Sequence, residues 1–265
     1  MRLPFYKYQG TGNDFVLIDN RQKVLGTSAE ALAKKLCHRK WGIGADGMLL
    51  LQNHSDYVFE VLYYNADGSP SFCANGCRCA VHLAEALGLM AEDVHFLAAD
   101  GPHWAAANQN VVQLSMNAVT GIQKLSAGYW LDTGAPHYVQ WGTDFKGLSV
   151  ADEGKAVRNR PAFQKVGVNV NFVQPAKGNT LVVRTYERGV EAETLSCGTG
   201  AVAAALVAAT QGYHSPVAIN MPGGRLQVSF AKGQEGYFQD IHLTGPVQRV
   251  FFGEIALGVF DGVLR

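Results

Sequence analysis

The sequence has little charge and no excess of either sign. Asp, Glu, Lys and Arg make up only 17% of its 265 residues, against roughly 25% in an average globular protein, and 22 basic residues balance 22 acidic ones. Because no basic excess is present, we expect binding neither to nucleic acid nor to a membrane surface. Hydrophobic residues reach 48%, which is enough to build a large core.

A long apolar run is also missing. The first residues, MRLPFYKYQGTGNDF, lack the apolar stretch of a secretory signal, and the most apolar segment, residues 200–209, is too short to cross a bilayer. We therefore expect a soluble cytoplasmic protein, whose thiols stay reduced. The five cysteines, an odd number, also argue against a disulfide scaffold.

Helical patterns are few, and short β-like runs separated by turn signals such as NADG and PGG dominate. One helical pattern, at 28–37, has Ser28 as its N-cap, and two others each follow a cysteine. This mixture predicts an α+β fold with mixed, mostly antiparallel sheets. The expected strands are 15–19, 57–64, 111–116, 169–173, 181–186 and 226–230.

The chain contains a weak internal repeat. The segment CANGCRCAVHLAEALG (73–88) aligns with CGTGAVAAALVAATQG (197–212), and a β-like run and a polar turn precede each. Both begin with a cysteine, continue as an apolar helix and end on a glycine suited to a left-handed C-cap. Chance similarity of two apolar helices is the alternative. The repeat predicts two similar halves, each a sheet around one central helix that starts at a cysteine.

A cysteine at a helix N-terminus is suited to acid–base chemistry. The unpaired N–H groups and the positive end of the helix dipole lower the pKa of such a thiol toward neutrality. Two such groups, one a thiolate and one a thiol, can take a proton from one face of a carbon and return one to the other face. The same helix starts can bind a carboxylate. The pattern therefore predicts stereoinversion without a cofactor by Cys73 and Cys197.

Other roles for the cysteines remain open on pattern alone. The spacing of Cys73, Cys77 and Cys79 differs from the paired cysteines of zinc sites, so we expect no metal. Cys77, Cys79 and Cys37 lie within predicted apolar helices, where burial as small hydrophobic residues is expected. For Cys73 and Cys197, structural burial and reactivity fit the pattern equally well.

Many segments of the chain resemble the diaminopimelate epimerase family of cofactor-independent amino acid epimerases, in the family's order and spacing. The two cysteine motifs, taken together with the ERG block, are the most specific. The matching segments are KYQGTGNDFVLIDN (7–20), GIGADG (42–47), NADGS (65–69), CANGCRC (73–79), DTGAPHYV (132–139), GVNVNFV (167–173), YERGVEAETLSCGTGA (186–201), MPGGRLQV (221–228) and LTGPVQRVFFGE (243–254).

This resemblance implies an organisation that agrees with the repeat. The first half comprises residues 1–121 with a returning C-terminal strand at about 255–265, and the second half comprises residues 122–254. Each half is a mixed, mostly antiparallel sheet wrapped around a central helix, and the active site lies in the cleft between the halves. Family members commonly form homodimers, so a homodimer is expected.

The resemblance also implies the site residues. Cys73 and Cys197 match the catalytic pair, and His137 matches a histidine that lines the site. Arg188 is suited to grip the carboxylate of the end that does not react, and Glu187 its ammonium group. Simpler roles remain open. Asn13 and Asn65 fit turn residues, and Glu187 and Arg188 fit a solvated charge pair at a strand end. The substrate-binding positions are Asn13, Asn65, Ala74, Asn75, Gly76, Asn169, Glu187, Arg188, Gly198 and Thr199.

The activity that the resemblance implies is conversion of LL-2,6-diaminopimelate, a diamino diacid, to its meso form. This reaction belongs to lysine and peptidoglycan-precursor synthesis and needs no cofactor and no metal. One alternative is an epimerase of another amino acid, such as histidine or hydroxyproline, by the same mechanism. Another is a structural or metal-binding protein that uses the cysteine cluster.

Three departures from the family concern the substrate fit and leave the two cysteines unchanged. Ala74 replaces a glycine of the usual C-G-N-G, which costs energy if that residue needs a positive φ. Ala135 stands where an asparagine is common, and the segment before Cys73 is one residue shorter than expected.

Overall fold

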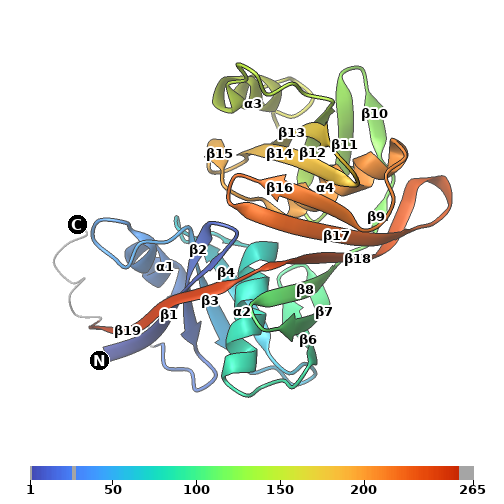
Figure 1. Cartoon of the computed structure of the whole chain (residues 1–265). Helices are drawn as coiled ribbons and strands as arrows, with labels where there is room; N and C mark the ends of the chain where they lie inside the picture. Colours follow the sequence, from blue (N-terminus) through green and yellow to red (C-terminus); the bar gives the residue numbers. More distant parts are fainter. Residues whose placement is uncertain (1, 26–27, 257–265) are drawn as a thin grey trace. The chain divides into compact units, whose positions relative to one another are not determined.

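The structure is a computed structural model that describes residues 2–25 and 28–256 (Figure 1). Its contacts divide the chain into two compact units, Met1–Leu114 with Pro246–Arg265, and Ser115–Gly245. The boundaries predicted from the sequence, after residues 121 and 254, lie seven and nine residues later than these. Most of the strand expected at 255–265 falls on residues 257–265, which lie outside the described residues.

The first unit is a mixed β-sheet with two helices. Its described strand pairs are antiparallel apart from β2–β3 and β4–β6, which are parallel. Strand β19 pairs with β1 from Arg2↔Ala256 to Gln9↔Gln248, so the two lie side by side (Figure 1). The elements are β1 (Arg2–Gly10), β2 (Asn13–Asp19), α1 (Ala29–Cys37), β3 (Gly47–Gln52), β4 (Glu60–Asn65), β5 (Pro70–Ser71), α2 (Ala74–Ala86), β6 (Asp93–Ala98), β7 (Gly101–Asn108), β8 (Val111–Met116) and β19 (Gln248–Ala256).

The second unit repeats this plan. Its described pairs are antiparallel apart from β12–β13 and β14–β16, which are parallel. The elements are β9 (Val119–Thr120), β10 (Gln123–Leu125), β11 (Gly128–Asp132), β12 (Pro136–Trp141), α3 (Val150–Arg158), β13 (Asn169–Ala176), β14 (Thr180–Glu187), β15 (Ala192–Thr194), α4 (Gly198–Thr210), β16 (Val217–Met221), β17 (Gly224–Lys232), the 3-10 turn η1 (Gln234–Gly236) and β18 (Tyr237–Pro246).

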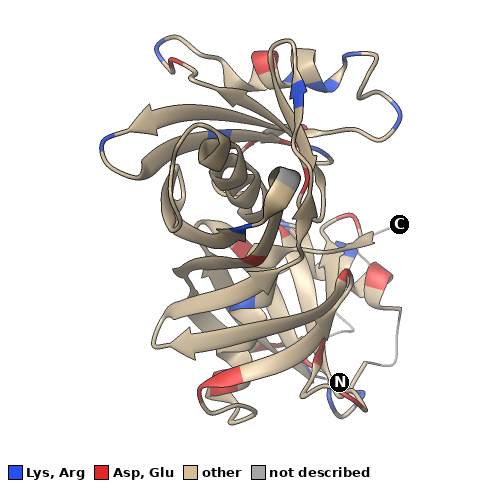
Figure 2. Cartoon of the chain, turned by 90° about the vertical axis from the view of Figure 1, so that its right-hand side faces the viewer, with Lys and Arg blue, Asp and Glu red and all other residues tan. Residues whose placement is uncertain are grey.

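The helices α2 and α4 confirm the predicted repeat. Each has 13 residues and takes its cysteine, Cys73 or Cys197, as its N-cap. Gly88 and Gly212 follow them with φ angles of 72° and 92°, the left-handed conformation expected at a helix end. No residue of 201–209 is more than 8% exposed, and α4 carries no charged residue (Figure 2). Each buried Val or Leu contributes about 1.5–3 kcal/mol, so packing on all sides stabilises α4.

The other two helices lie nearer the surface. The Ser28 side chain accepts a hydrogen bond from the Ala31 N–H, which confirms the predicted start of α1. Helix α3 was not predicted, because its sequence is polar and only Val150 and Val157 supply buried apolar side chains. Tyr186 packs closely against the Gly154 backbone of α3. This contact is a tertiary one, which a local pattern does not reveal.

The six predicted strands are all present, although β4 begins at Glu60, three residues later than expected. Cys37, Cys77 and Cys79 are at most 2% exposed, as predicted for small hydrophobic residues in helices. In the part of the chain that the structure describes, no helix is long and apolar enough to span a membrane.

Candidate active site

Cys73 lies at the start of α2 in a small polar cluster. Its Sγ accepts a hydrogen bond from the Gly76 N–H at 3.5 Å and lies 3.7 Å from Asn13 Oδ1. Asn75 Nδ2 donates to the same Asn13 oxygen at 3.4 Å. The structure thus brings four of the predicted residues together, and Cys73 is half-buried with access to solvent.

Asp46 determines which end of the Asn13 amide faces Cys73. Asn13 Nδ2 donates to Asp46 Oδ2 at 2.7 Å. Because a carboxylate only accepts hydrogen bonds, the NH2 group must point toward Asp46 and Oδ1 toward Cys73. Arg39 holds the other Asp46 oxygen at 2.6 Å, and the Asp14 N–H donates to Oδ2 at 3.1 Å. The side chain of Asn13 is therefore oriented as an acceptor toward the cysteine.

An ion-pair network that runs from the buried Lys7 to the exposed Arg39 supports this arrangement. Lys7 Nζ lies 2.6 Å from Asp14 Oδ2, and Arg39 Nη2 lies 2.8 Å from Asp14 Oδ1. Burial alone raises the pKa of Asp14, but hydrogen bonds from Arg39 and Lys7 outweigh it and hold the pKa well below its ordinary value. The carboxylate therefore stays ionised and keeps the charges around Asp46 in place.

Two further predicted residues of the first unit have clear local roles. Asn65 ends β4, and its NH2 group donates to the Ser69 carbonyl, the Ser69 hydroxyl and the Ser71 hydroxyl within the following turn. Ala74 is the first residue of α2 and does not have a positive φ. The alanine that replaces the family's glycine therefore imposes no backbone strain.

Cys197 occupies the corresponding position in the second unit. It is 6% exposed, and its Sγ lies 3.5 Å from Thr199 Oγ1. The same hydroxyl lies 2.9 Å from His137 Nε2, and Thr133 Oγ1 donates to the Thr199 carbonyl at 2.9 Å. Thr199, expected to act through its backbone amide, also connects His137 to Cys197 through its hydroxyl.

The direction of these hydrogen bonds is set by Asn171. Its NH2 group donates to the Tyr138 carbonyl at 3.2 Å and to His137 Nδ1 at 2.9 Å, while its Oδ1 accepts from Thr185 at 2.9 Å. Because Nδ1 accepts, the proton of neutral His137 must be on Nε2, which then donates to Thr199. The Thr199 hydroxyl is left to donate to Cys197 Sγ. The chain therefore presents a hydrogen-bond donor to this sulfur.

His137 is completely buried, so it lies behind Thr199. Burial, with a smaller contribution from the charge of Arg188, lowers the pKa of His137 to about 3. At neutral pH the imidazole is uncharged. It acts by orienting Thr199.

A second polar group lies beside this one. Asn169 opens β13 opposite His137 in the parallel pairing, and its Oδ1 accepts from the Arg188 N–H at 2.8 Å. Arg188 Nη1 donates to the Val166 carbonyl at 2.9 Å, and Glu187 Oε2 accepts from the Thr194 hydroxyl at 2.9 Å. Asn169 and Arg188 are thus in contact, while the side chain of Glu187 is held by Thr194.

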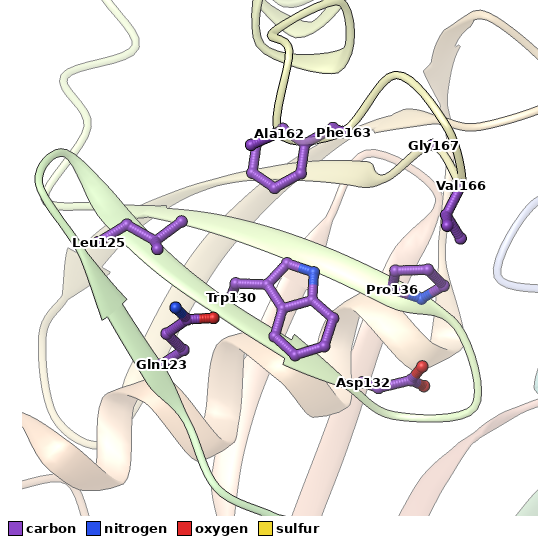
Figure 3. A pocket seen from close by; sticks show the side chains of 9 residues that line it. All are labelled: Gln123, Leu125, Trp130, Asp132, Pro136, Ala162, Phe163, Val166 and Gly167. Carbon is purple, nitrogen blue, oxygen red and sulfur yellow. The ribbon is translucent and has the colours of Figure 1, made fainter.

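The second unit also has a shallow pocket of about 330 Å³ that contains none of the predicted residues (Figure 3). Trp130 and Phe163 line it and pack in the same apolar cluster as α3. Pro136 also lines it, whereas the next residue, His137, faces Thr199. Because side chains alternate along a strand, the pocket and the Cys197 group lie on opposite faces of β12.

Sequence reasoning missed several residues of these two groups: Arg39, Asp46, Thr133 and Asn171. Asp46 lies in the GIGADG segment that matched the family, although no role was assigned to it. Asn171 interrupts a buried apolar strand, NVNFV, and a polar residue in such a position needs partners. That signal could have indicated a buried hydrogen-bond network, but not its members.

Comparison with known proteins agrees with this geometry. The sequence profile described as diaminopimelate epimerase matches residues 5–120 and 129–250. The chain is 42% identical to the diaminopimelate epimerase of Flavobacterium psychrophilum, over 94% of this chain and 98% of that one, and 37% identical to that of Aquifex aeolicus, over 98% and 100%. Among solved structures, a PhzF-family phenazine biosynthesis protein from Bacillus anthracis shares the fold, with a TM-score of 0.75. The two sequences are 11% identical, and the match covers 97% of this chain and 100% of that one.

The fold, the repeated cysteine-capped helices and these matches over nearly the whole length lead to one assignment. The chain belongs to the diaminopimelate epimerase family.

Proposed function

We propose that this protein converts LL-2,6-diaminopimelate to the meso form, with Cys73 and Cys197 as the acid/base pair and no cofactor. The observation that carries the proposal is a cysteine at the N-cap of each of two central helices, each with a polar group beside its sulfur. Membership in the family supports the substrate. The reaction takes place in the cytoplasm, where thiols stay reduced, and its product serves lysine or peptidoglycan-precursor synthesis.

At the reacting end of the substrate, one sulfur is a thiolate and takes the α-proton. The other is a thiol and gives its proton to the opposite face of the carbanion, so protons and charge balance. The N–H groups at the starts of α2 and α4 bind the α-carboxylate and take up the charge that develops on it. Asn13 presents its oxygen, which suits it to accept from the α-ammonium group.

The other end of the substrate is an amino acid of fixed configuration, and the second set of residues suits it. Asn65 has its NH2 group occupied in a turn, so its oxygen is the end that can accept from an ammonium group. Asn169 has its oxygen occupied by Arg188, so its NH2 group is the end that donates to a carboxylate. Arg188 adds the positive charge for that carboxylate and Glu187 the negative charge for the ammonium.

Deuterium exchange tests this proposal. Protein with reductant in D2O is given LL-diaminopimelate, and separately L-histidine and trans-4-hydroxy-L-proline, and the Cα–H signals and stereoisomers are followed. We expect deuterium and the meso isomer only with diaminopimelate, and loss of inversion in Cys73→Ser and in Cys197→Ser. Exchange on another amino acid alone would refute the substrate, and inversion by both serine variants would refute the two-base mechanism.

We also propose that the protein is a homodimer that uses exposed hydrophobic residues of β19. Phe252 is 74% exposed, and Val250 and Phe251 are 53% and 46% exposed. Adjacent exposed hydrophobic residues of this size are typical of contact surfaces. Light scattering after size exclusion should give twice the chain mass of 28.6 kDa for the wild type and the chain mass for Phe252→Lys. Val111→Lys, at another exposed apolar position, should stay dimeric, and a monomeric wild type would refute the proposal.

A further inference from the structure

Arg78 on α2 is a buried cation with few partners. Its side chain is 0% exposed, and neither Nε nor Nη1 has a hydrogen-bond partner. Nη2 lies 3.5 Å from Thr11 Oγ1, the outer limit of a hydrogen bond. Burying an ion is costly unless an opposite charge compensates it, so this residue calls for a partner charge.

The guanidinium lies beside the first turn of α2. Side chains on a helix lean toward its N-terminus, and that direction leads from Arg78 back toward Cys73. Nη2 comes within 3.3 Å of the point where a Cβ on Gly10 would lie, and the Asn75 carbonyl oxygen comes equally close to that point. Cys79 Sγ lies 3.4 Å from the same point, so the positive group lies beside the first two turns of α2, between the levels of Asn75 and Cys79.

Among the described residues, the charges that act on this guanidinium are those of three thiols, Cys79, Cys73 and Cys77. Burial raises the pKa of Cys77 and of Cys79 far above neutrality, so both remain uncharged. Cys73 is the half-exposed member of the three and the N-cap of the helix. Of these three thiols, Cys73 is therefore the one that can form an anion near Arg78.

Several other titratable groups around α2 have partners of their own. Lys7 on β1 pairs with Asp14 on β2, Tyr8 on β1 bonds His82 on α2, and His103 on β7 bonds Asp100 in the turn before it. The distances are 2.6, 3.2 and 2.8 Å. Other titratable residues on α2 and on strands packed against it are Arg2, Tyr6, Asp19, Glu60, Tyr63, Tyr64 and Glu85.

We propose that Arg78 is a positioning residue that supplies the buried counter-charge for the Cys73 thiolate. This inference deepens the proposed function and rests on it for its meaning, because the reaction needs a thiolate at one of the two cysteines. The two residues are five positions apart, about 7.5 Å along the helix axis. The two positions also differ by about 140° around that axis, and a partly buried charge roughly 10 Å from a thiol shifts its pKa by about one unit.

The test measures the thiol itself and needs no substrate. In a Cys197→Ser background, the rate at which iodoacetamide alkylates Cys73 is followed against pH, by mass spectrometry of the peptide that contains it. Arg78→Met removes the charge and Arg78→Lys keeps it. Arg21→Met is the matched control, because it removes a cation of the same unit that pairs with Asp19.

We expect Arg78→Met to raise the apparent pKa of Cys73 by about one unit and to slow alkylation at pH 7 about tenfold. Arg78→Lys and Arg21→Met should stay within about 0.3 unit of the parent. An unchanged pKa in Arg78→Met, even with a lower melting temperature, would overturn the proposal in favour of a structural role.

Arg78→Gln serves as a second neutral variant. If neither neutral variant folds, Arg78 is required for the fold, and the proposal is also overturned. Because alkylation does not depend on epimerase activity, its outcome stands apart from the substrate test. A protein with the expected pKa shift and no exchange on diaminopimelate would refute the proposed function alone.

Discussion

The buried neutral state of His137 predicts a specific loss of stability in acid. Burial lowers the pKa of this imidazole from 6.5 to about 3, whereas the unfolded chain keeps the ordinary value. Between these values the unfolded state binds a proton that the native state does not. The free energy of unfolding therefore falls as pH drops below about 6.5, by up to about 1.4 kcal/mol per pH unit, until it levels off near pH 3.

The magnitude follows from the two pKa values. Between pH 7 and pH 4.5 His137 accounts for a loss of about 2.5 kcal/mol. His137→Gln removes the titrating group but keeps an oxygen for Asn171 and an N–H for Thr199. It should cost about 1–2 kcal/mol at pH 7, because the shorter side chain fits less well, and should then lose about 2.5 kcal/mol less than the wild type at pH 4.5.

Urea unfolding at the two pH values measures this difference. With Trp41 and Trp104 replaced by phenylalanine, the remaining Trp130 and Trp141 report on the second unit by fluorescence. His95→Gln is the control, because it removes a histidine from the exposed side of β6. Equal losses in the wild type and His137→Gln, to within about 0.5 kcal/mol, would refute the reasoning.

Three further predictions concern the two polar clusters. Asp46→Asn should lower kcat/KM about 10- to 100-fold, because Asn13 loses the charge that orients its amide. Asp19→Asn, which removes a carboxylate paired with Arg21, should leave kcat/KM unchanged; equal kcat/KM values in the two variants would count against the orienting role. Gly200→Ala should destabilise by roughly 3 kcal/mol or more in urea, because its Cβ would overlap Asn171 Oδ1. Gly76→Ala, at the same helix position of α2, would meet Leu49 at 3.1 Å and Phe15 at 3.5 Å and should cost less; the reverse order would be inconsistent with these contacts. Thr199→Val should slow alkylation of Cys197 at pH 7 about tenfold in a Cys73→Ser background, and Thr199→Ser should not, since serine keeps the hydroxyl that donates to the sulfur; an unaffected valine variant would show that this donor is unimportant.

Local patterns predicted the elements that form the two central helices. Three patterns depend on short-range preferences: the apolar run after Cys197, the spacing of each cysteine from its terminal glycine, and the polar turn before each cysteine. The preferences are the ability of Gly88 and Gly212 to adopt a positive φ and the periodicity of buried side chains along a helix. Helix α3 escaped prediction because its stability comes from Tyr186 and other distant residues.

In the candidate site, too, some residues could be predicted from the sequence and others could not. Cys73, Cys197 and the residues carried over from the family were identified from the sequence, because motifs specify which residue types stand at a helix start. Asp46, Asn171 and Arg78 acquired their roles only in the structure, since each acts on a residue through a contact or charge between side chains.

The sequence by itself therefore determined the fold class, the two cysteine-capped helices and the family. The tertiary structure alone decided which atom of Asn13 faces Cys73, which nitrogen of His137 carries its proton and where the buried charge of Arg78 lies. The physical reason is that helix starts and strand periodicity are encoded by neighbours in sequence. The direction of a hydrogen bond and the field of a charge depend on groups that only folding brings together.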